Sequence, residues 1–124
     1  MAAMDLDGSW VNQNGSTLRL AVASDGTVTG EFRTRKGRAA AGRSYDVVGR
    51  RNAGLVAFHV DWQDLEVNLH AMVSFTGRLL VDEDGHDAIH TVWVLAREYE
   101  DQAQTYPTEA WNAFLTNADT WRRV

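Results

Sequence analysis

The chain has 124 residues, a formal net charge of −5, one proline and no cysteine. A chain of this length fits one domain with a substantial core. Its acidic charge argues against a general nucleic-acid-binding protein, and without cysteine it forms no disulfide bond. It contains no run of about 18 consecutive apolar residues, so the sequence predicts no membrane-spanning helix.

Turn signals recur along the chain between short segments in which apolar and polar residues alternate, a pattern typical of antiparallel strands. Asn14 with Gly15 and Asp25 with Gly26 are tight-turn signals. The segment 106–111 has a proline at its second position and is expected to form a short helical turn. We predict a terminal extension at 1–4 and one all-β domain over 5–124, with eight strands near 8–14, 17–24, 27–35, 44–51, 54–62, 68–81, 87–98 and 115–123.

Because side chains alternate along a strand, the period of two assigns residues to faces. The columns expected to face inward are Val28, Gly30, Phe32 and Thr34; Phe58, Val60 and Trp62; Leu69, Ala71, Val73, Phe75 and Gly77; and Ile89, Thr91, Trp93 and Leu95. The opposite faces carry Met72, Val92 and Val94. Apolar residues on an outer face indicate a subunit interface, although single exposed apolar residues are normal in soluble proteins.

Tryptophan is frequent for a chain of this length. Trp111 lies in the last predicted connection, and the other tryptophans lie within or at the ends of predicted strands: Trp10, Trp62, Trp93 and Trp121. Large aromatic side chains beside a few polar ones suit the mouth of a small closed barrel that holds one ligand.

Six segments have the order and nearly the spacing of the avidin and streptavidin family, which the chain resembles from residue 8 to residue 124. They are WVNQNGST from Trp10, DGTVTGEF from Asp25, VGR from Val48, FHVDW from Phe58, FTGR from Phe75 and TVWVL from Thr91. Each segment alone is a weak signal, but six in order are specific. The resemblance implies an eight-stranded antiparallel up-and-down β-barrel that binds biotin non-covalently and uses no cofactor.

Biotin has a ureido ring, a thioether ring and a carboxylate tail, so its pocket needs hydrogen-bond donors, acceptors and apolar walls. The resemblance implies that Asn12 and Ser16 donate to the ureido oxygen. It implies that Thr34 and Asp119 accept the ureido N–H groups. The walls that it implies are Trp62, Phe75, Trp93 and Leu95, with Trp111 donated to a neighbouring subunit's pocket.

Three pocket positions depart from the family pattern. Phe32, Ala71 and Val73 stand where the family usually has a tyrosine, a serine and a threonine. A missing partner for a buried polar ligand group costs roughly 1–3 kcal/mol, so three losses weaken binding by about 10³-fold or more. We therefore expect weaker biotin binding than in streptavidin, or a preference for another cyclic, urea-like or more apolar ligand.

The segment 33–43 carries five basic residues and no acidic one. In the family this loop closes over the ligand, and Arg38 falls near the position that contacts the carboxylate. A guanidinium pairs bidentately with a carboxylate. The alternative is an ordinary solvated loop.

Each site assignment also has a plainer interpretation. Asn12 and Ser16 suit the turn between them, Asp119 suits an exposed charge, and the tryptophans suit a core. Their combination in family order favours binding. Two other functions stay open: a carrier whose pocket has drifted to another small ligand, and an oligomeric interaction protein with a vestigial pocket. Neither a catalytic motif nor metal-ligand spacing is found, so the sequence predicts neither an enzyme nor a metal site.

The resemblance also implies a homo-oligomer, with a tetramer favoured over a dimer. Dimeric members of the family lack a tryptophan at the position of Trp111 and carry a cysteine pair, and this chain shows the reverse on both counts. Family analogy implies secretion, but residues 1–4 do not resemble a signal peptide, so the sequence leaves the location open.

Overall fold

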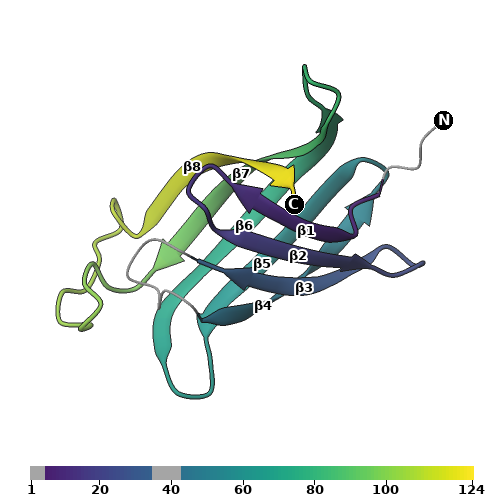
Figure 1. The fold of residues 1–124 in the computed structure, drawn as a ribbon. Helices are drawn as coiled ribbons and strands as arrows, with labels where there is room; N and C mark the ends of the chain where they lie inside the picture. The colour runs from purple at the N-terminus through teal and green to yellow at the C-terminus, as the bar shows by residue number, and fades with distance from the viewer. Residues whose placement is uncertain (1–4, 35–42) are drawn as a thin grey trace.

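The computed structural model describes residues 5–34 and 43–124. They form a closed barrel in which every strand pairs antiparallel with the next one along the chain (Figure 1). β1 also pairs with β8, Trp10 lying opposite Arg123, and this pairing closes the barrel. The strands are β1 (Gly8–Asn12), β2 (Thr17–Val22), β3 (Thr27–Arg33), β4 (Ser44–Asn52), β5 (Leu55–Gln63), β6 (Asn68–Val81), β7 (Asp87–Arg97) and β8 (Phe114–Arg123). The predicted eight-stranded up-and-down barrel is confirmed. No helix among the described residues has the length and apolar character needed to cross a membrane.

The strand boundaries agree with the sequence prediction to within two residues at each end. β1 ends early because the turn begins at Asn12, whose carbonyl accepts the N–H of Gly15 at 3.1 Å. The helical turn predicted at 106–111 is wrong. Pro107 forms an isolated antiparallel bridge with Tyr99. The later part of the β7–β8 connection is therefore extended and pairs with its earlier part.

The predicted inward columns are confirmed, because their residues are buried or half-buried, and Phe58, Val60 and Trp62 of β5 are all buried between exposed neighbours. On the outer face, Val92 and Met72 are exposed, as the alternation predicted. A strand with one buried and one solvated face is expected in an antiparallel barrel.

Two fully buried tryptophans anchor the core. Trp10 donates its indole N–H to the carbonyl of Leu6 at 3.1 Å, and the Arg123 guanidinium lies 4.2 Å from the centre of the Trp10 ring system, in a cation–π contact. Trp121 donates its indole N–H to the hydroxyl of Thr91 at 3.1 Å. These partners allow two large polar-tipped rings to be buried without an unpaired N–H.

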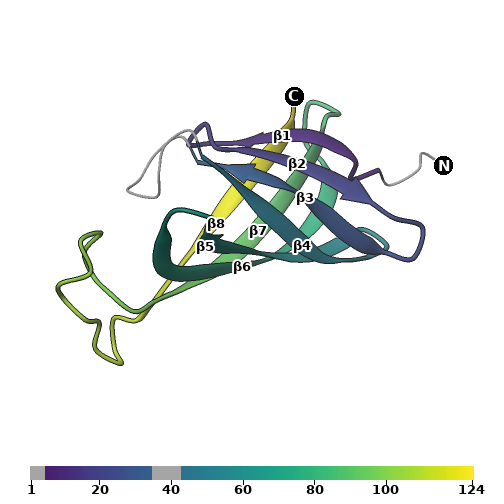
Figure 2. The same cartoon turned by 90° about the horizontal axis from the view of Figure 1, so that it is seen from below.

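One end of the barrel carries the β1–β2 turn, the β5–β6 turn and the long β7–β8 connection. Figure 2 shows this connection reaching well beyond the barrel wall. The opposite end carries the three remaining short hairpin turns. The up-and-down topology therefore collects the longest irregular segment of the described chain beside the open end of the barrel.

Candidate ligand-binding site

A cavity of about 510 Å³ opens at the end of the barrel that carries the β7–β8 connection. Cavities of this size hold small organic ligands. Ten of the predicted site residues line it: Asn12, Phe32, Thr34, Trp62, Ala71, Val73, Phe75, Trp93, Leu95 and Asp119. Sequence alternation placed most of them on the inner face of the barrel, and the resemblance to the family selected them as site residues.

Two of the predicted site residues have other positions, and a third falls outside the described part of the chain. Ser16 is buried in the β1–β2 turn and is not among the described residues that line the cavity. Trp111 is 83% exposed and, in the described chain, lies outside the cavity of its own barrel. Arg38 lies outside the described residues.

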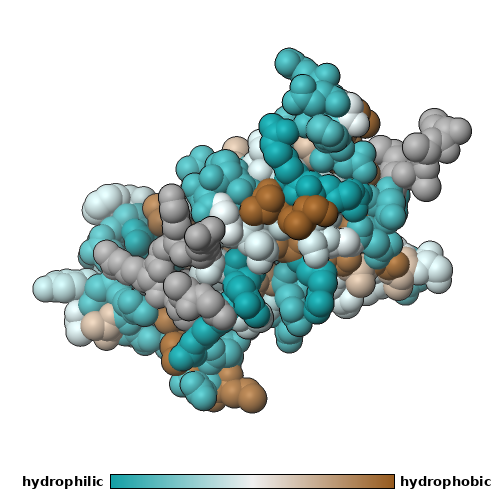
Figure 3. Space-filling model, viewed as in Figure 1, coloured by the Kyte–Doolittle hydropathy of each residue, from teal (hydrophilic) through white to brown (hydrophobic). Residues whose placement is uncertain are grey.

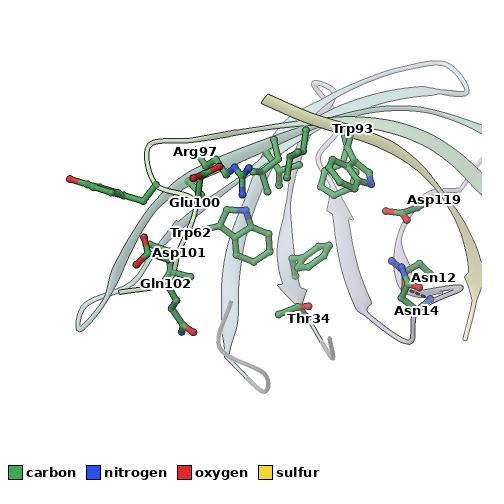
Figure 4. A pocket seen from close by; sticks show the side chains of 18 residues that line it. Asn12, Asn14, Thr34, Trp62, Trp93, Arg97, Glu100, Asp101, Gln102 and Asp119 are labelled. Atoms are coloured by element: carbon green, nitrogen blue, oxygen red, sulfur yellow. Dashed lines mark hydrogen bonds between the residues drawn. The ribbon is translucent and has the colours of Figure 1, made fainter. Parts of the chain in front are cut away.

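Asn12, Asn14 and Asp119 form one polar end of the cavity, which we call the amide end (Figure 4). The Asn12 side-chain oxygen accepts the backbone N–H groups of Asn14 at 3.0 Å and Ser16 at 2.9 Å. Two N–H donors on one atom identify it as the carbonyl oxygen of the amide. Asn12 thus supports the turn, and its NH₂ group remains the donor that it can offer to a ligand.

Gln13 fixes the position of Asp119. Its side-chain nitrogen donates to the Asp119 carboxylate at 2.6 Å, and its side-chain oxygen accepts the N–H of Thr120 at 3.0 Å. Gln13 therefore joins the β1–β2 turn to two consecutive residues of β8, Asp119 and Thr120. Asp119 still lines the cavity, so a donor from a ligand can reach it. The prediction did not single out Gln13, although its place directly after Asn12 in the turn was a signal.

Aromatic rings form the wall between the polar ends of the cavity. Phe32 meets Trp62 edge-on with ring centres 5.4 Å apart, and it lies 5.9 Å from Phe75. Phe75 stacks on Phe58 at 4.7 Å, and Trp121 packs behind Phe32 at 5.9 Å. These edge and stacked contacts hold each ring in one orientation, so the apolar wall is formed before a ligand arrives.

A second polar end lies at the mouth, where Figure 4 shows Arg97, Glu100, Asp101 and Gln102. We call it the arginine end. Arg97 is the last residue of β7 and continues the inward column of Trp93 and Leu95, a signal that the prediction did not use. The other three residues belong to the irregular β7–β8 connection, where no periodicity marks a lining residue.

The β7–β8 connection is held in shape by its own hydrogen bonds. The Asp101 carboxylate accepts the Thr105 hydroxyl and the backbone N–H groups of Thr105 and Tyr106. These bonds lower the pKa of Asp101, and the bond from the Thr105 hydroxyl contributes most. The side-chain nitrogen of Asn112 donates to Glu100. The mouth of the cavity is therefore built on a cross-linked connection rather than on an isolated loop.

A closed antiparallel barrel with an aromatic-walled cavity and a polar group at each end defines a small-molecule-binding barrel protein. The avidin family model matches residues 1–124. The chain belongs to the avidin family.

Individual relatives agree with this assignment. Afifavidin of Afifella pfennigii is 32% identical over 93 residues, a match that covers 73% of this chain and 57% of afifavidin. The match thus spans little more than half the length of that relative. The crystal structure of a rhizavidin–biotin complex superposes with a TM-score of 0.80 at 30% identity, covering 97% of this chain and 92% of that one. A short afifavidin–biotin complex gives a TM-score of 0.79 at 25% identity, covering 99% and 92%.

Proposed function

We propose that this chain is a binding protein, not an enzyme, and that it binds biotin non-covalently in the cavity of its barrel. The observation that carries the proposal is the cavity itself: a donor and an acceptor, Asn12 and Asp119, face an aromatic wall inside one barrel. The biotin complexes of rhizavidin and short afifavidin support it.

The cavity offers complementary groups for each part of biotin. The Asn12 NH₂ group donates to the ureido oxygen, and Asp119 accepts a ureido N–H. Thr34, which is buried at the cavity wall, provides a hydroxyl for the second N–H. In a water-poor cavity these bonds are stronger than in solvent. The thioether ring and alkyl tail lie against Trp62, Trp93 and their aromatic neighbours. A further donation from Ser16 stays a prediction.

We expect the affinity for biotin to be reduced. Phe32, Ala71 and Val73 line the cavity with apolar groups only, so three lost polar contacts weaken binding by about 10³-fold or more relative to streptavidin. Isothermal titration with biotin measures it. Asp119→Ala should weaken binding at least about tenfold, whereas Asp46→Ala, an exposed carboxylate on β4, should not. Absence of both heat and a thermal shift at millimolar biotin contradicts the proposal, and streptavidin-like affinity contradicts the weakening.

The same three apolar residues favour a second candidate function, a carrier whose cavity has drifted to a more apolar cyclic ligand. Mass spectrometry of small molecules that co-purify with the protein tests this directly. A stoichiometric ligand other than biotin supports the carrier. An empty cavity that binds neither biotin nor any co-purifying molecule supports an interaction protein with a vestigial pocket.

We also propose that the protein is a homo-oligomer, with a tetramer favoured over a dimer. The outward faces of β6, β7 and β8 present a patch of three rows of paired residues, all exposed and none charged. We call this the outer patch; its rows are Met72, Ala96 and Phe114; Ser74, Val94 and Thr116; and Thr76, Val92 and Ala118. By contrast, the face drawn in Figure 3 is largely hydrophilic, and its β2–β3 pair carries an ion pair, Arg19 with Glu31 at 3.1 Å. A second copy covering the outer patch removes its apolar surface from water.

Trp111 is proposed to close a neighbouring subunit's cavity. Its ring is 83% exposed, and leaving a large indole in water forfeits roughly 1.5–3 kcal/mol of hydrophobic stabilisation. Two-fold symmetry makes the exchange reciprocal between a pair of subunits. Trp111→Ala should weaken ligand binding without loss of the fold, as measured by titration and circular dichroism. An oligomer whose ligand affinity is untouched by Trp111→Ala refutes the capping role.

A further inference from the structure

Arg97 brings a positive charge to the mouth of the cavity. It lies opposite Ala71 in the β6–β7 register, and the small alanine leaves room for the longer side chain. Its Nε and Nη2 groups donate to the carbonyl of Asn112 at 3.3 Å and 3.2 Å. That contact orients the guanidinium of a residue that lines the cavity, and Nη1 makes no hydrogen bond to the described residues.

The carboxylates beside Arg97 are engaged elsewhere. Among the described residues no ion pair joins Arg97 to an acidic side chain. Asp101 accepts three hydrogen bonds from Thr105 and Tyr106, and Glu100 accepts one from Asn112. The guanidinium is therefore a charged donor group without a carboxylate partner in the described chain.

Trp62 supplies a second donor at the same end. Its indole Nε1 is buried and has no hydrogen-bond partner among the residues that the structure describes, in contrast to the paired indoles of Trp10 and Trp121. Figure 4 shows the nitrogen edge of Trp62 turned toward the Arg97 end of the cavity. A buried N–H left unpaired costs about 1–3 kcal/mol, and a ligand acceptor at this place removes that cost.

We propose that Arg97 and the indole N–H of Trp62 form an anion subsite that takes the carboxylate tail of the ligand. Both groups only donate hydrogen bonds, so they require an acceptor, and the charge of the guanidinium favours an anionic carboxylate over a neutral amide or ester. The inference rests on the proposed function for the ring at the amide end. The subsite makes Arg97 a specificity-determining residue, and its donors take the place of the hydroxyl that Ala71 lacks.

Isothermal titration of biotin and its neutral analogue biotinamide tests the subsite. The wild-type protein should bind biotin about 10- to 100-fold more tightly than biotinamide, as expected for charge-assisted hydrogen bonds. In Arg97→Gln the ratio should fall to near one while biotinamide affinity stays within about twofold. Arg97→Lys should keep part of the preference, because it keeps the charge but not the fork. Arg78→Gln, on the outward face of β6, is the matched control.

Two further variants separate the donors. Trp62→Phe keeps an aromatic ring but removes the N–H, and it should lower the preference for biotin about threefold or more. If Arg38→Gln abolishes the preference and Arg97→Gln retains it, the charge at the mouth comes from the segment outside the described residues and the subsite is overturned. Melting temperatures of every variant show whether each one folds.

Octanoate and octanamide distinguish failure of the subsite from failure of biotin binding, because neither carries a ureido ring. If biotin does not bind but octanoate is preferred over octanamide in an Arg97-dependent way, the proposed function fails and the subsite stands. If biotin binds and its preference over biotinamide is unchanged in Arg97→Gln, the function stands and the subsite fails. An equal response of wild type and Arg97→Gln to both acid and amide pairs also overturns it.

Discussion

Phe32 is the residue at which a single added atom should change affinity most. It is 6% exposed, lines the cavity and is held edge-on between Trp62 and Trp121. Phe32→Tyr adds a hydroxyl to the cavity wall, as a further donor for the ureido oxygen that is proposed to bind Asn12. We expect biotin binding to tighten by about 1–2 kcal/mol, or roughly 5- to 30-fold. Paired titrations measure it, and an unchanged or poorer affinity means that the ureido ring does not lie there.

Gln13 should act on the ligand through Asp119. Gln13→Leu keeps the side-chain size but removes the hydrogen bond to the Asp119 carboxylate and the one from the neighbouring Thr120 N–H. We expect about tenfold weaker biotin binding, and no further loss when the change is made in an Asp119→Ala background, because a positioning residue has nothing left to position. Gln63→Leu, exposed on β5, is the control. Additive losses in the double variant contradict the indirect role.

At this scale the sequence predicted most of the cavity residues that lie on strands, with Arg97 and Leu115 as exceptions, and missed those of the β7–β8 connection. Alternation placed Trp93 and Leu95 on the interior face, and the same alternation extended to Arg97 would have found it. Tyr99 and Glu100 line the cavity from an irregular connection, where side-chain direction depends on tertiary hydrogen bonds that no local pattern encodes.

Strands and hairpins were predictable because their signals are local: a period of two and turn residues such as Asp25 with Gly26. The exception was the segment 106–111. Proline at the start of a possible turn favoured a helix, but the N–H of Glu100 donates to the carbonyl of Tyr106 at 2.8 Å. Pairing between the early and late parts of the connection determines its backbone conformation. The paired residues are too far apart in the sequence for a local turn signal to predict the pairing.

Aspartates hold four of the connections, and each has a lowered pKa: Asp25, Asp64, Asp82 and Asp101. In the β6–β7 turn, Asp82 accepts the N–H groups of His86 and Asp84, each at 2.9 Å, and the Arg122 guanidinium at 2.8 Å. The bond from His86 contributes most to lowering the pKa of Asp82.

Asp82→Asn should therefore destabilise the protein in a pH-dependent way. Because the folded-state pKa lies below the unfolded value of about 3.9, the stabilisation is present above that value and is lost as pH falls through the folded pKa. Urea unfolding of both proteins should show a lower free energy of unfolding for Asp82→Asn at pH 7 and a gap that closes toward pH 2. Asp84→Asn, whose carboxylate accepts no hydrogen bond from the described residues, should give no such gap. A gap for Asp82→Asn that is the same at both pH values contradicts the account.

At the scale of the whole molecule, closure of the barrel matters for association. The pairing of β1 with β8 means that the described strands have no unpaired edge to which a strand of another chain could add. Association between copies must then use a face. The outer patch on β6–β8 is suited to this because none of its residues is charged, whereas outward positions beside it carry charges such as Arg78 and Asp61. The sequence predicted Met72, Val92 and Val94 on an outer face. Only the register between β6, β7 and β8 shows that they form one patch with Phe114.

Val94 lies at the centre of the outer patch, between Ser74 and Thr116, and its substitution tests the oligomer. Val94→Glu places a charge where a second copy has no partner for it, and burying an unpaired charge is costly enough to prevent association. Light scattering should give a tetramer for the wild type and a monomer of 13.8 kDa for Val94→Glu. Val81→Glu, 64% exposed at the end of β6 and outside the patch, should keep the wild-type mass. Circular dichroism should show an intact barrel in both variants. A monomeric wild type contradicts the proposed homo-oligomer, and a dimeric wild type contradicts only the tetramer. An oligomer that persists in Val94→Glu means that the interface lies on another face.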